Sequence, residues 1–164
     1  MTKIAPSTAV NEYYLARIAA SKANDRLKSR DGASEETGID HNRLKRIEMG
    51  TLTPYSEEIV LMADAYNAPE LLNHYCTHSC PIGQRILPYA EVNRLDRMTI
   101  NIVAAEKSIT GIGSMMLDIA EDGIVTPDEI PRLMTISQAL WKVMKASIEM
   151  HTWLEKYIKK GANT

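Results

Sequence analysis

Hydrophobic positions recur at steps of three and four residues through most of the chain, which is the period of an amphipathic helix. From about residue 10 to residue 28 this spacing predicts one helix with a stripe that faces the core. The stripe consists of Val10, Tyr14, Leu15, Ile18, Ala19 and Ala23. The first part of the chain is therefore expected to begin with a helix of about five turns.

Two short helices are predicted next, over residues 29 to 37 and 41 to 49. Each begins at or just after a residue that favours helix N-termini, and each is followed by a glycine that favours helix ends. These capping and terminating residues are Ser29, Gly38, Asp40 and Gly50. Leu44 and Ile47 share one face of the second helix, so its opposite face is predicted to be exposed.

Two more helices complete this region. The first covers residues 56 to 67 and is strongly amphipathic through Ile59, Val60, Met62, Ala63 and Tyr66. The second is short, begins near Pro69, and carries Leu71 and Leu72. The pattern thus predicts five helices in fewer than 80 residues.

The stretch CPIGQRILPYA, residues 80 to 90, contains two prolines and a glycine, which favour a domain boundary. We therefore expect a first domain over residues 1–80, a linker over 81–90, a second domain over 91–160 and a tail over 161–164.

Two long helices are predicted in the second domain. The apolar positions of the first alternate steps of three and four as in a coiled-coil seam: Leu95, Met98, Ile102, Ala105, Ile109, Ile112, Met116 and Ile119. The second, residues 130 to 158, has a broader stripe: Ile130, Leu133, Met134, Leu140, Trp141, Met144, Ile148, Leu154 and Ile158. Gly111 and Gly113 interrupt the first helix, either for close approach of a partner helix or at a bend.

These two helices are expected to form a long antiparallel hairpin, joined by Glu121 to Thr126. A hairpin alone would leave the side of Trp141 and Ile148 exposed. The simplest cover is a second copy of the chain, which predicts a homodimer through residues 91–160; packing onto the first domain is the alternative.

Composition excludes several classes of protein. The chain is 45% hydrophobic and 24% charged, values typical of a folded globular protein, and its net charge of -2 provides no overall basic field for nucleic acid. Residues 1–10 do not resemble a signal peptide, and no uncharged apolar run reaches 18 residues. We therefore expect a cytoplasmic protein without membrane contact, in which Cys76 and Cys80 are reduced.

The segment from Ser29 to Pro54 resembles the helix-turn-helix of phage repressors, Cro proteins and the wider xenobiotic-response-element family of bacterial regulators. The resemblance lies in the spacing of Ser29, Gly38, Ile39, Asp40, Leu44, Ile47, Glu48, Gly50 and Pro54. It covers about residues 10–76. It implies a five-helix, lambda-repressor-like DNA-binding domain. Together with the helical hairpin that the apolar stripes predict, this gives an all-α fold.

The resemblance also implies that the helix over residues 41–49 reads the major groove of DNA. Asparagine can pair with adenine and arginine with guanine through two hydrogen bonds each. The family pattern implies base reading by His41, Asn42 and Arg46, and phosphate contacts by Arg30, Arg43 and Lys45.

Some positions depart from the family pattern. Ala33 and Thr37 stand where larger aliphatic residues are usual, and Ser34 replaces the usual alanine. Where the family often has an arginine on the first helix, this chain has Ala23. We therefore expect the partner of Glu48 to be one of two other basic residues, Lys22 or Arg26.

Two segments could suggest metal binding. His74, Cys76, His78 and Cys80 alternate within seven residues, but alternate residues rarely complete a tetrahedral zinc site, so a helix end with a buried Cys76 is the preferred interpretation. A disulfide switch between the two cysteines is a further alternative. Residues 118–129 resemble a calcium loop, but Ala120 removes a ligand, and a capping box from Thr126 to Glu129 explains the same residues. We expect no cofactor.

The sequence thus predicts a homodimeric transcriptional regulator, a repressor, that binds double-stranded DNA at a palindromic operator. The alternative is a protein-interaction module, antitoxin-like or a scaffold, that keeps the fold without binding DNA. A ligand sensor using the apolar interior around Trp141 and Trp153 is compatible with the first interpretation. Catalysis is not expected, because no nucleophile, histidine and acid stand at a recognisable spacing and no phosphate-binding glycine loop is present.

Overall fold

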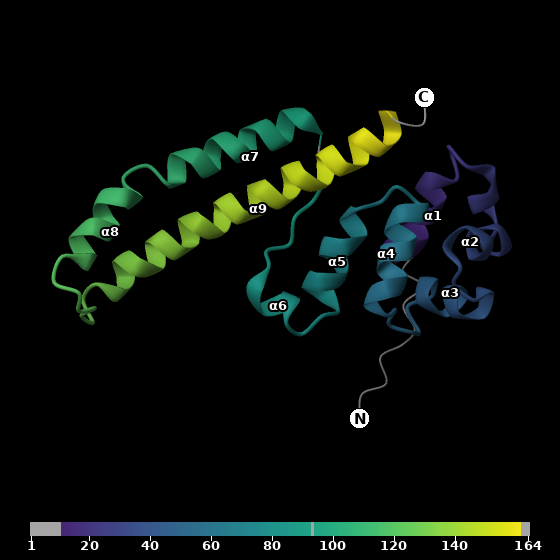
Figure 1. Cartoon of the computed structure of the whole chain (residues 1–164), viewed down its shortest axis with the longest axis horizontal. Coiled ribbons are helices and arrows are strands. Elements are labelled where there is room, and N and C mark those ends of the chain that lie inside the picture. Colours follow the sequence, from purple (N-terminus) through teal and green to yellow (C-terminus); the bar gives the residue numbers. More distant parts are fainter. Residues whose placement is uncertain (1–10, 93, 162–164) are drawn as a thin grey trace. The chain divides into compact units, whose positions relative to one another are not determined.

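The computed structural model describes residues 11–92 and 94–161, with side chains as far as residue 158. Throughout these residues the regular structure is helical, which confirms the all-α prediction (Figure 1). Contacts divide the chain into two units. The first comprises residues 1–85 and 156–164, and the second residues 86–155. The boundary after Arg85 thus lies within the segment expected to be a linker.

The first unit is built from short helices. They are α1 (Glu12–Ala20), the 3-10 helix η1 (Asp25–Lys28), α2 (Arg30–Thr37), α3 (His41–Glu48), α4 (Ser56–Ala65) and α5 (Glu70–His78), followed by α6 (Gly83–Ile86). The structure thus has a short helix within residues 81–90. The core of the first unit is closed by side chains with almost no exposed surface: Leu27, Leu44, Ile47, Ile59, Met62 and Leu71.

The predicted ends of α2 and α3 are confirmed. Ser29 accepts a hydrogen bond from the Gly32 backbone N–H, and Asp40 accepts one from that of Arg43, both at 3.0 Å. Gly38 has a φ of 73°, a left-handed conformation that residues with a Cβ rarely adopt. Capping therefore sets the length of both helices and the tight turn between them.

The prediction of one helix over residues 10–28 is wrong. Helix α1 ends at Ala20, and Asn24 caps η1 by accepting a hydrogen bond from the Arg26 backbone N–H at 3.1 Å. The polar cap thus competes with continuation of the helix. Val10 lies outside the described residues.

The predicted core stripe of α1 is also wrong in its orientation. Tyr13 and Arg17 are buried, whereas Leu15 is 47% exposed and Ala19 is exposed. The helix is rotated because Arg17 has buried partners in the first unit, as described below. In α4, Val60 is similarly 49% exposed although it was expected on the buried face.

The second unit contains α7 (Leu95–Ser108), α8 (Ile112–Ala120) and most of α9 (Ile130–Gly161). Helices α7 and α8 run alongside α9 (Figure 1). Asn101 of α7 donates a hydrogen bond to Glu149 of α9 at 2.9 Å, and Arg132 of α9 pairs with Asp118 of α8 at 3.3 Å. Residue numbers therefore fall along α9 as they rise from α7 to α8, so the pairing is antiparallel.

The expected first long helix of this unit is two helices. Helix α7 ends at Ser108, and Gly111, with a φ of 81°, precedes α8. Gly111 therefore marks a break between two helices, as the alternative of a bend predicted, whereas Gly113 lies within α8. The predicted seam is confirmed only in part: Met98, Ala105 and Ile119 are buried, whereas Leu95, Ile109 and Met116 are exposed.

The broad stripe predicted for α9 is largely not the face that packs inside the hairpin. Ile136, Ala139 and Ala146 are buried, whereas Met134 is 57% and Leu140 53% exposed. Helices α7 and α8 cover only one side of α9, so a stripe wider than one contact leaves part of its surface uncovered. Among the described residues, no helix has the length and apolar character needed to cross a membrane.

Gly32 is predicted to be required for packing of η1 against α2. A Cβ on Gly32 would lie 2.1 Å from the backbone oxygen of Arg26, too close for any side chain. We expect Gly32→Ala to lower the free energy of unfolding by more than about 1 kcal/mol, measured by urea denaturation. Gly113→Ala is the control, because Gly113 is helical with nothing within 4 Å of its Cβ position; it should stabilise by about 0.5 to 1 kcal/mol. Equal effects would show that the close approach is not constraining.

Candidate nucleic-acid interface

Helix α3 presents one buried and one exposed face. Leu44 and Ile47 have no exposed surface, whereas Asn42, Lys45 and Arg46 are exposed. Neither a hydrogen bond nor an ion pair engages these three polar side chains within the described part of the chain. The exposed face of α3 therefore offers one amide and two cations to a ligand outside the first unit.

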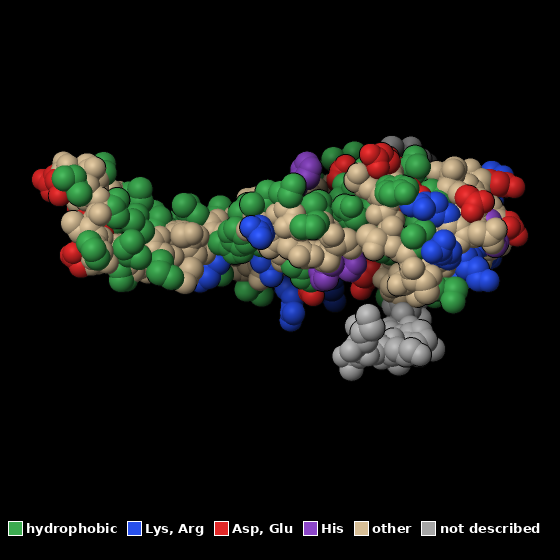
Figure 2. Space-filling view, turned by 90° about the horizontal axis from the view of Figure 1, so that it is seen from below, with side chains coloured by type: hydrophobic (Ala, Val, Ile, Leu, Met, Phe, Trp, Pro, Cys, Tyr) green, Lys and Arg blue, Asp and Glu red, His purple; other side chains and the backbone are tan. Residues whose placement is uncertain are grey.

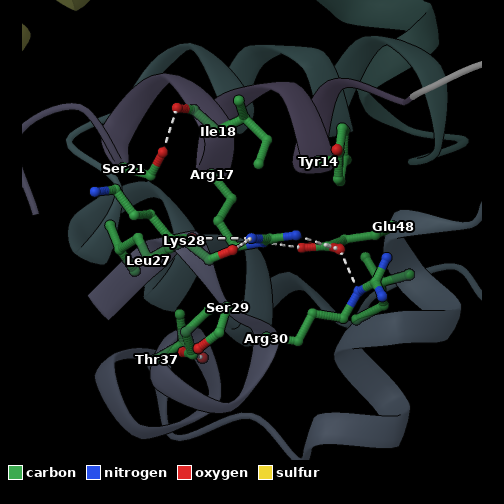
Figure 3. A network of polar contacts seen from close by, with 12 residues as sticks. Tyr14, Arg17, Ile18, Ser21, Leu27, Lys28, Ser29, Arg30, Thr37 and Glu48 are labelled. Carbon is green, nitrogen blue, oxygen red and sulfur yellow. Dashed lines mark hydrogen bonds and ion pairs between the residues drawn. The ribbon is translucent and has the colours of Figure 1, made fainter. Parts of the chain in front are cut away.

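Glu48, at the end of α3, is held by a buried ion pair with Arg17 of α1 (Figure 3). Arg17 donates from Nε to Oε1 at 2.5 Å and from Nη2 to Oε2 at 3.0 Å. Its Nη1 donates to the backbone oxygens of Leu27, at 2.9 Å, and Lys28, at 3.3 Å. Both charged groups are buried and almost fully hydrogen-bonded, as a buried ion pair requires. Because Arg17 of α1 binds both Glu48 and the backbone of η1, the pair joins α1, η1 and α3.

The expectation that Lys22 or Arg26 would serve Glu48 is therefore wrong. Arg26 instead pairs with Glu35 and Glu36 on the surface of α2, and Lys22 is exposed. Arg17 is four residues after the buried Tyr13, so it lies on the face of α1 that meets the core. That position was the available signal, but a charged residue does not count toward an apolar stripe.

Arg30 of α2 also binds Glu48. Its Nε lies 2.7 Å from Oε2, and its side chain is 32% exposed (Figure 3). Arg30 is thus placed at the protein surface, as a phosphate contact requires, while one of its donors is committed to the buried carboxylate. This bond fixes the start of α2 to the end of α3.

Arg43 is engaged more fully than the sequence suggested. It forms two hydrogen bonds with Glu58 of α4 and lies 4.2 Å from the centre of the Tyr55 ring. Burial alone would raise the pKa of Glu58, but the bonds from Arg43 and from the Tyr55 backbone N–H outweigh it and lower the pKa. Arg43 therefore joins α3 to α4, and Lys45 is the expected phosphate contact without an ion pair in the described structure.

The C-terminal end of α3 is held by hydrogen bonds from two further residues, Asn11 and Thr51. Asn11 donates from its side chain to the backbone oxygen of Ile47 at 2.5 Å. The backbone N–H of Thr51 donates to the oxygen of Arg46 at 3.0 Å, and the Thr51 hydroxyl donates to the same oxygen at 3.1 Å. These bonds hold the end of α3 to Asn11 and to the turn that follows the helix.

His41 lies at the start of α3, beside an acidic group of α2. Its Nδ1 is 2.7 Å from Oδ1 of Asp31, whose side chain is 84% exposed. A protonated His41 would form an ion pair there, and the nearby carboxylate opposes the approach of a phosphate. His41 is thus the least accessible of the three expected base-reading residues, with its side chain 41% exposed.

The alternating histidines and cysteines lie mostly along α5 and do not gather into a site. The rings of His74 and His78 stack at 4.3 Å, and no group of three or more histidine, cysteine or acidic side chains is placed to hold a metal ion within the described ranges. Burial, with the nearby His78, lowers the pKa of His74. Cys76 and Cys80 are free thiols.

The loop resembling a calcium site has the geometry of a helix start. Glu129 accepts hydrogen bonds from the backbone N–H and the hydroxyl of Thr126, both at 2.8 Å. Gly123 has a φ of 71°, and Asp122 accepts from the backbone N–H of Ile124 at 3.0 Å. These contacts support capping as the role of the residues.

A groove of about 510 Å³ lies between α7 and α9 within the second unit. Its floor includes Ala105 and Ala146, and its polar groups are Glu106, Ser147 and His151. Neither Trp141 nor Trp153 lines this groove. The groove therefore does not coincide with the ligand site that was expected around the two tryptophans.

Comparisons of the chain with protein-family models, with curated proteins and with solved structures found no match.

The buried Arg17 is predicted to be the main stabilising partner of Glu48. We expect Arg17→Met to lower the free energy of unfolding by about 3 kcal/mol or more, because a buried carboxylate loses its principal partner. Loss of helical circular dichroism in urea measures the effect. Arg26→Met is the control, since Arg26 is 62% exposed and its pair with Glu35 should contribute less than about 1 kcal/mol. Similar small losses in both variants would contradict the role given to Arg17.

Proposed function

We propose that this chain is a sequence-specific DNA-binding transcriptional regulator, a repressor, that reads the major groove with α3. The observation that carries the proposal is the exposed face of α3, where Asn42, Lys45 and Arg46 project from a helix fastened at both ends and through its buried side. A major groove about 12 Å wide admits such a helix. The spacing that resembles the phage-repressor family supports the same function, with the first unit as a five-helix DNA-binding domain.

The side chains of α3 have distinct proposed roles. Asn42 and Arg46 are suited to base edges, because an amide matches adenine and a guanidinium matches guanine. His41 is the third base-reading candidate, and its contact with Asp31 would have to open or tilt when DNA binds. Lys45 is suited to a phosphate, which positions the protein without selecting a sequence.

Arg30 and Arg43 take modified roles in this proposal. Arg30 is the phosphate contact at the start of α2, supported by the positive end of that helix dipole. Arg43 acts mainly by positioning, since it is bound to Glu58 and packed on Tyr55. Non-specific affinity should be weak, because residues 11–54 carry eight basic and seven acidic side chains.

A homodimer through the second unit completes the proposed regulator. Two copies double the phosphate contacts and match a palindromic operator. The large exposed apolar surface of the hairpin supports association, because soluble monomers rarely expose such surface.

Selection from a random DNA library at physiological salt tests this function. We expect the native chain to enrich a two-fold-symmetric site. Asn42→Ala and Arg46→Ala should each weaken that site about tenfold and relax the preference at particular base pairs, because each removes up to two hydrogen bonds to a base.

Lys22→Ala provides the matched control, because Lys22 is an exposed cation outside α3. It should reduce affinity little and leave the base preference unchanged. If no site is enriched, or if the two α3 variants bind as the control does, the chain is better explained as a protein-interaction module that keeps the fold without DNA binding. The near-balance of charge in residues 11–54 is the observation that favours this second candidate.

Asp31 is predicted to limit the affinity for DNA. Removing its charge in Asp31→Asn should raise the affinity about fivefold at low salt, because a carboxylate beside His41 repels phosphate, and the gain should shrink as salt screens it. Fluorescence anisotropy with the selected site measures the change. Asp25→Asn is the control, since Asp25 is equally exposed but belongs to η1. An equal gain in the control would point to net charge alone.

A further inference from the structure

Helix α9 carries a second apolar stripe on the side away from its partners in the hairpin. Ile130, Met134, Trp141, Met144 and Ile148 follow one another at heptad positions, and Ser137 occupies the remaining one. Ile130 is 48%, Met134 57% and Trp141 41% exposed, while Met144 and Ile148 are half-buried. We define these six residues as the outer stripe.

The outer stripe is distinct from the face that packs inside the hairpin. The inner face is formed by Ile136, Ala139 and Ala146, which are buried, and by the half-buried Val143. At 3.6 residues per turn, this inner set lies on the opposite side of α9 from the outer stripe. The hairpin therefore has one satisfied and one unpartnered apolar seam on the same helix.

The hairpin has too little interior to be stable alone. In the described part of residues 86–155, the buried large apolar side chains are Met98, Ile119 and Ile136, whereas fifteen large apolar side chains are exposed, each by 39% or more. With on the order of 150 Å² for a large apolar side chain, half exposure of fifteen amounts to about 1,000 Å². This surface is spread over several sides of the hairpin, and Ile130, Met134 and Trp141 of the outer stripe belong to it. A standard dimer buries about 800 Å² per partner, so a second copy packed along the outer stripe and the residues beside it would cover part of what the hairpin leaves exposed.

We propose that two copies of the chain pair through their outer stripes. The two α9 helices would run antiparallel about a two-fold axis that crosses the outer stripe at the level of Ala139 along the helix. In this register Ile130 lies opposite Ile148 and Met134 opposite Met144. Trp141 lies opposite Ser137. This pairing would be the interface of the proposed homodimeric regulator. It rests on the proposed function only for its biological purpose, because the contacts themselves do not involve DNA.

The antiparallel direction follows from the sizes of the side chains. A large indole opposite a small hydroxymethyl group fills the layer without a gap or an overlap. In a parallel pair in register, Trp141 would meet Trp141 and Ser137 would meet Ser137, so one layer would be crowded and the next empty. A two-fold antiparallel pair is also closed, which limits assembly to two chains.

Charge favours the same direction. Residues 118–129, at the turn of the hairpin, contain Asp118, Glu121, Asp122, Asp128 and Glu129 and no lysine or arginine. Acidic side chains are visible at this end of the hairpin in Figure 2. A parallel pair would bring two such turns together, and their like charges would repel. The antiparallel pair keeps them at opposite ends of the interface.

Sedimentation of the full chain without DNA tests the interface. We expect the native chain to be a dimer at micromolar concentration and Trp141→Glu to raise the dimer dissociation constant at least 100-fold, because a charge would be buried opposite Ser137. Leu117→Glu is the control: Leu117 is 74% exposed on α8, about half a helical turn round from the buried Ile119, and should leave the dimer intact. A Trp141→Glu chain that stays dimeric would overturn the proposal.

Cross-linking determines the direction on chains that keep their fold. In a Cys76→Ser, Cys80→Ser background, chains with Met134→Cys are mixed with chains with Met144→Cys and treated with a short bismaleimide. We expect cross-links between the two different chains, and few within either kind alone. Cross-links between two Met134→Cys chains would indicate a parallel pair and overturn the register. Because no DNA is involved, a failed operator selection with a confirmed interface would reject only the proposed DNA binding.

Discussion

The first unit depends on one buried carboxylate. Glu48 stands at the end of α3 and accepts hydrogen bonds from Arg17 of α1 and Arg30 of α2, while Arg17 also binds the backbone at the end of η1. A charge placed in the interior is costly unless nearly all its bonding capacity is used, and this geometry uses it. The orientation of α1, the start of α2 and the position of α3 are therefore coupled through Glu48.

The contacts of Glu48 explain how α2, which contributes only small side chains to the core, can support the exposed helix α3. Ala33 and Thr37 of α2 are buried but small, and Thr37 uses its hydroxyl to bond the backbone oxygen of Ala33 at 2.7 Å. Apolar contact from α2 is accordingly modest. Polar connections compensate: Glu48 binds two arginines, and Glu58 binds Arg43. The exposed face of α3 is thereby left with Asn42, Lys45 and Arg46 as its uncommitted polar groups within the described structure.

The second unit differs from the first because much of its apolar surface is exposed. Its helices contact one another through small residues such as Ala105, Ala139 and Ala146, which bury little area. Most of its large side chains face outward. Because the area buried inside this hairpin is small, its own packing contributes little stability. In the proposed regulator, association and folding of this unit are therefore linked.

Local signals in the sequence determined where most helices lie and several of their ends, since Ser29, Gly38 and Asp40 act on their own neighbours through caps and a left-handed turn. They did not predict the end of α1 at Ala20 or the division of one long helix into α7 and α8. They also placed Leu44 and Ile47 in the core and the polar residues of α3 outside it. The tertiary structure alone decided the partner of Glu48, the engagement of Arg43 by Glu58 and which apolar stripe of α9 is covered. These features join residues from 15 to 48 positions apart. Periodicity describes the faces of a single helix, but which face is buried depends on the helices packed against it.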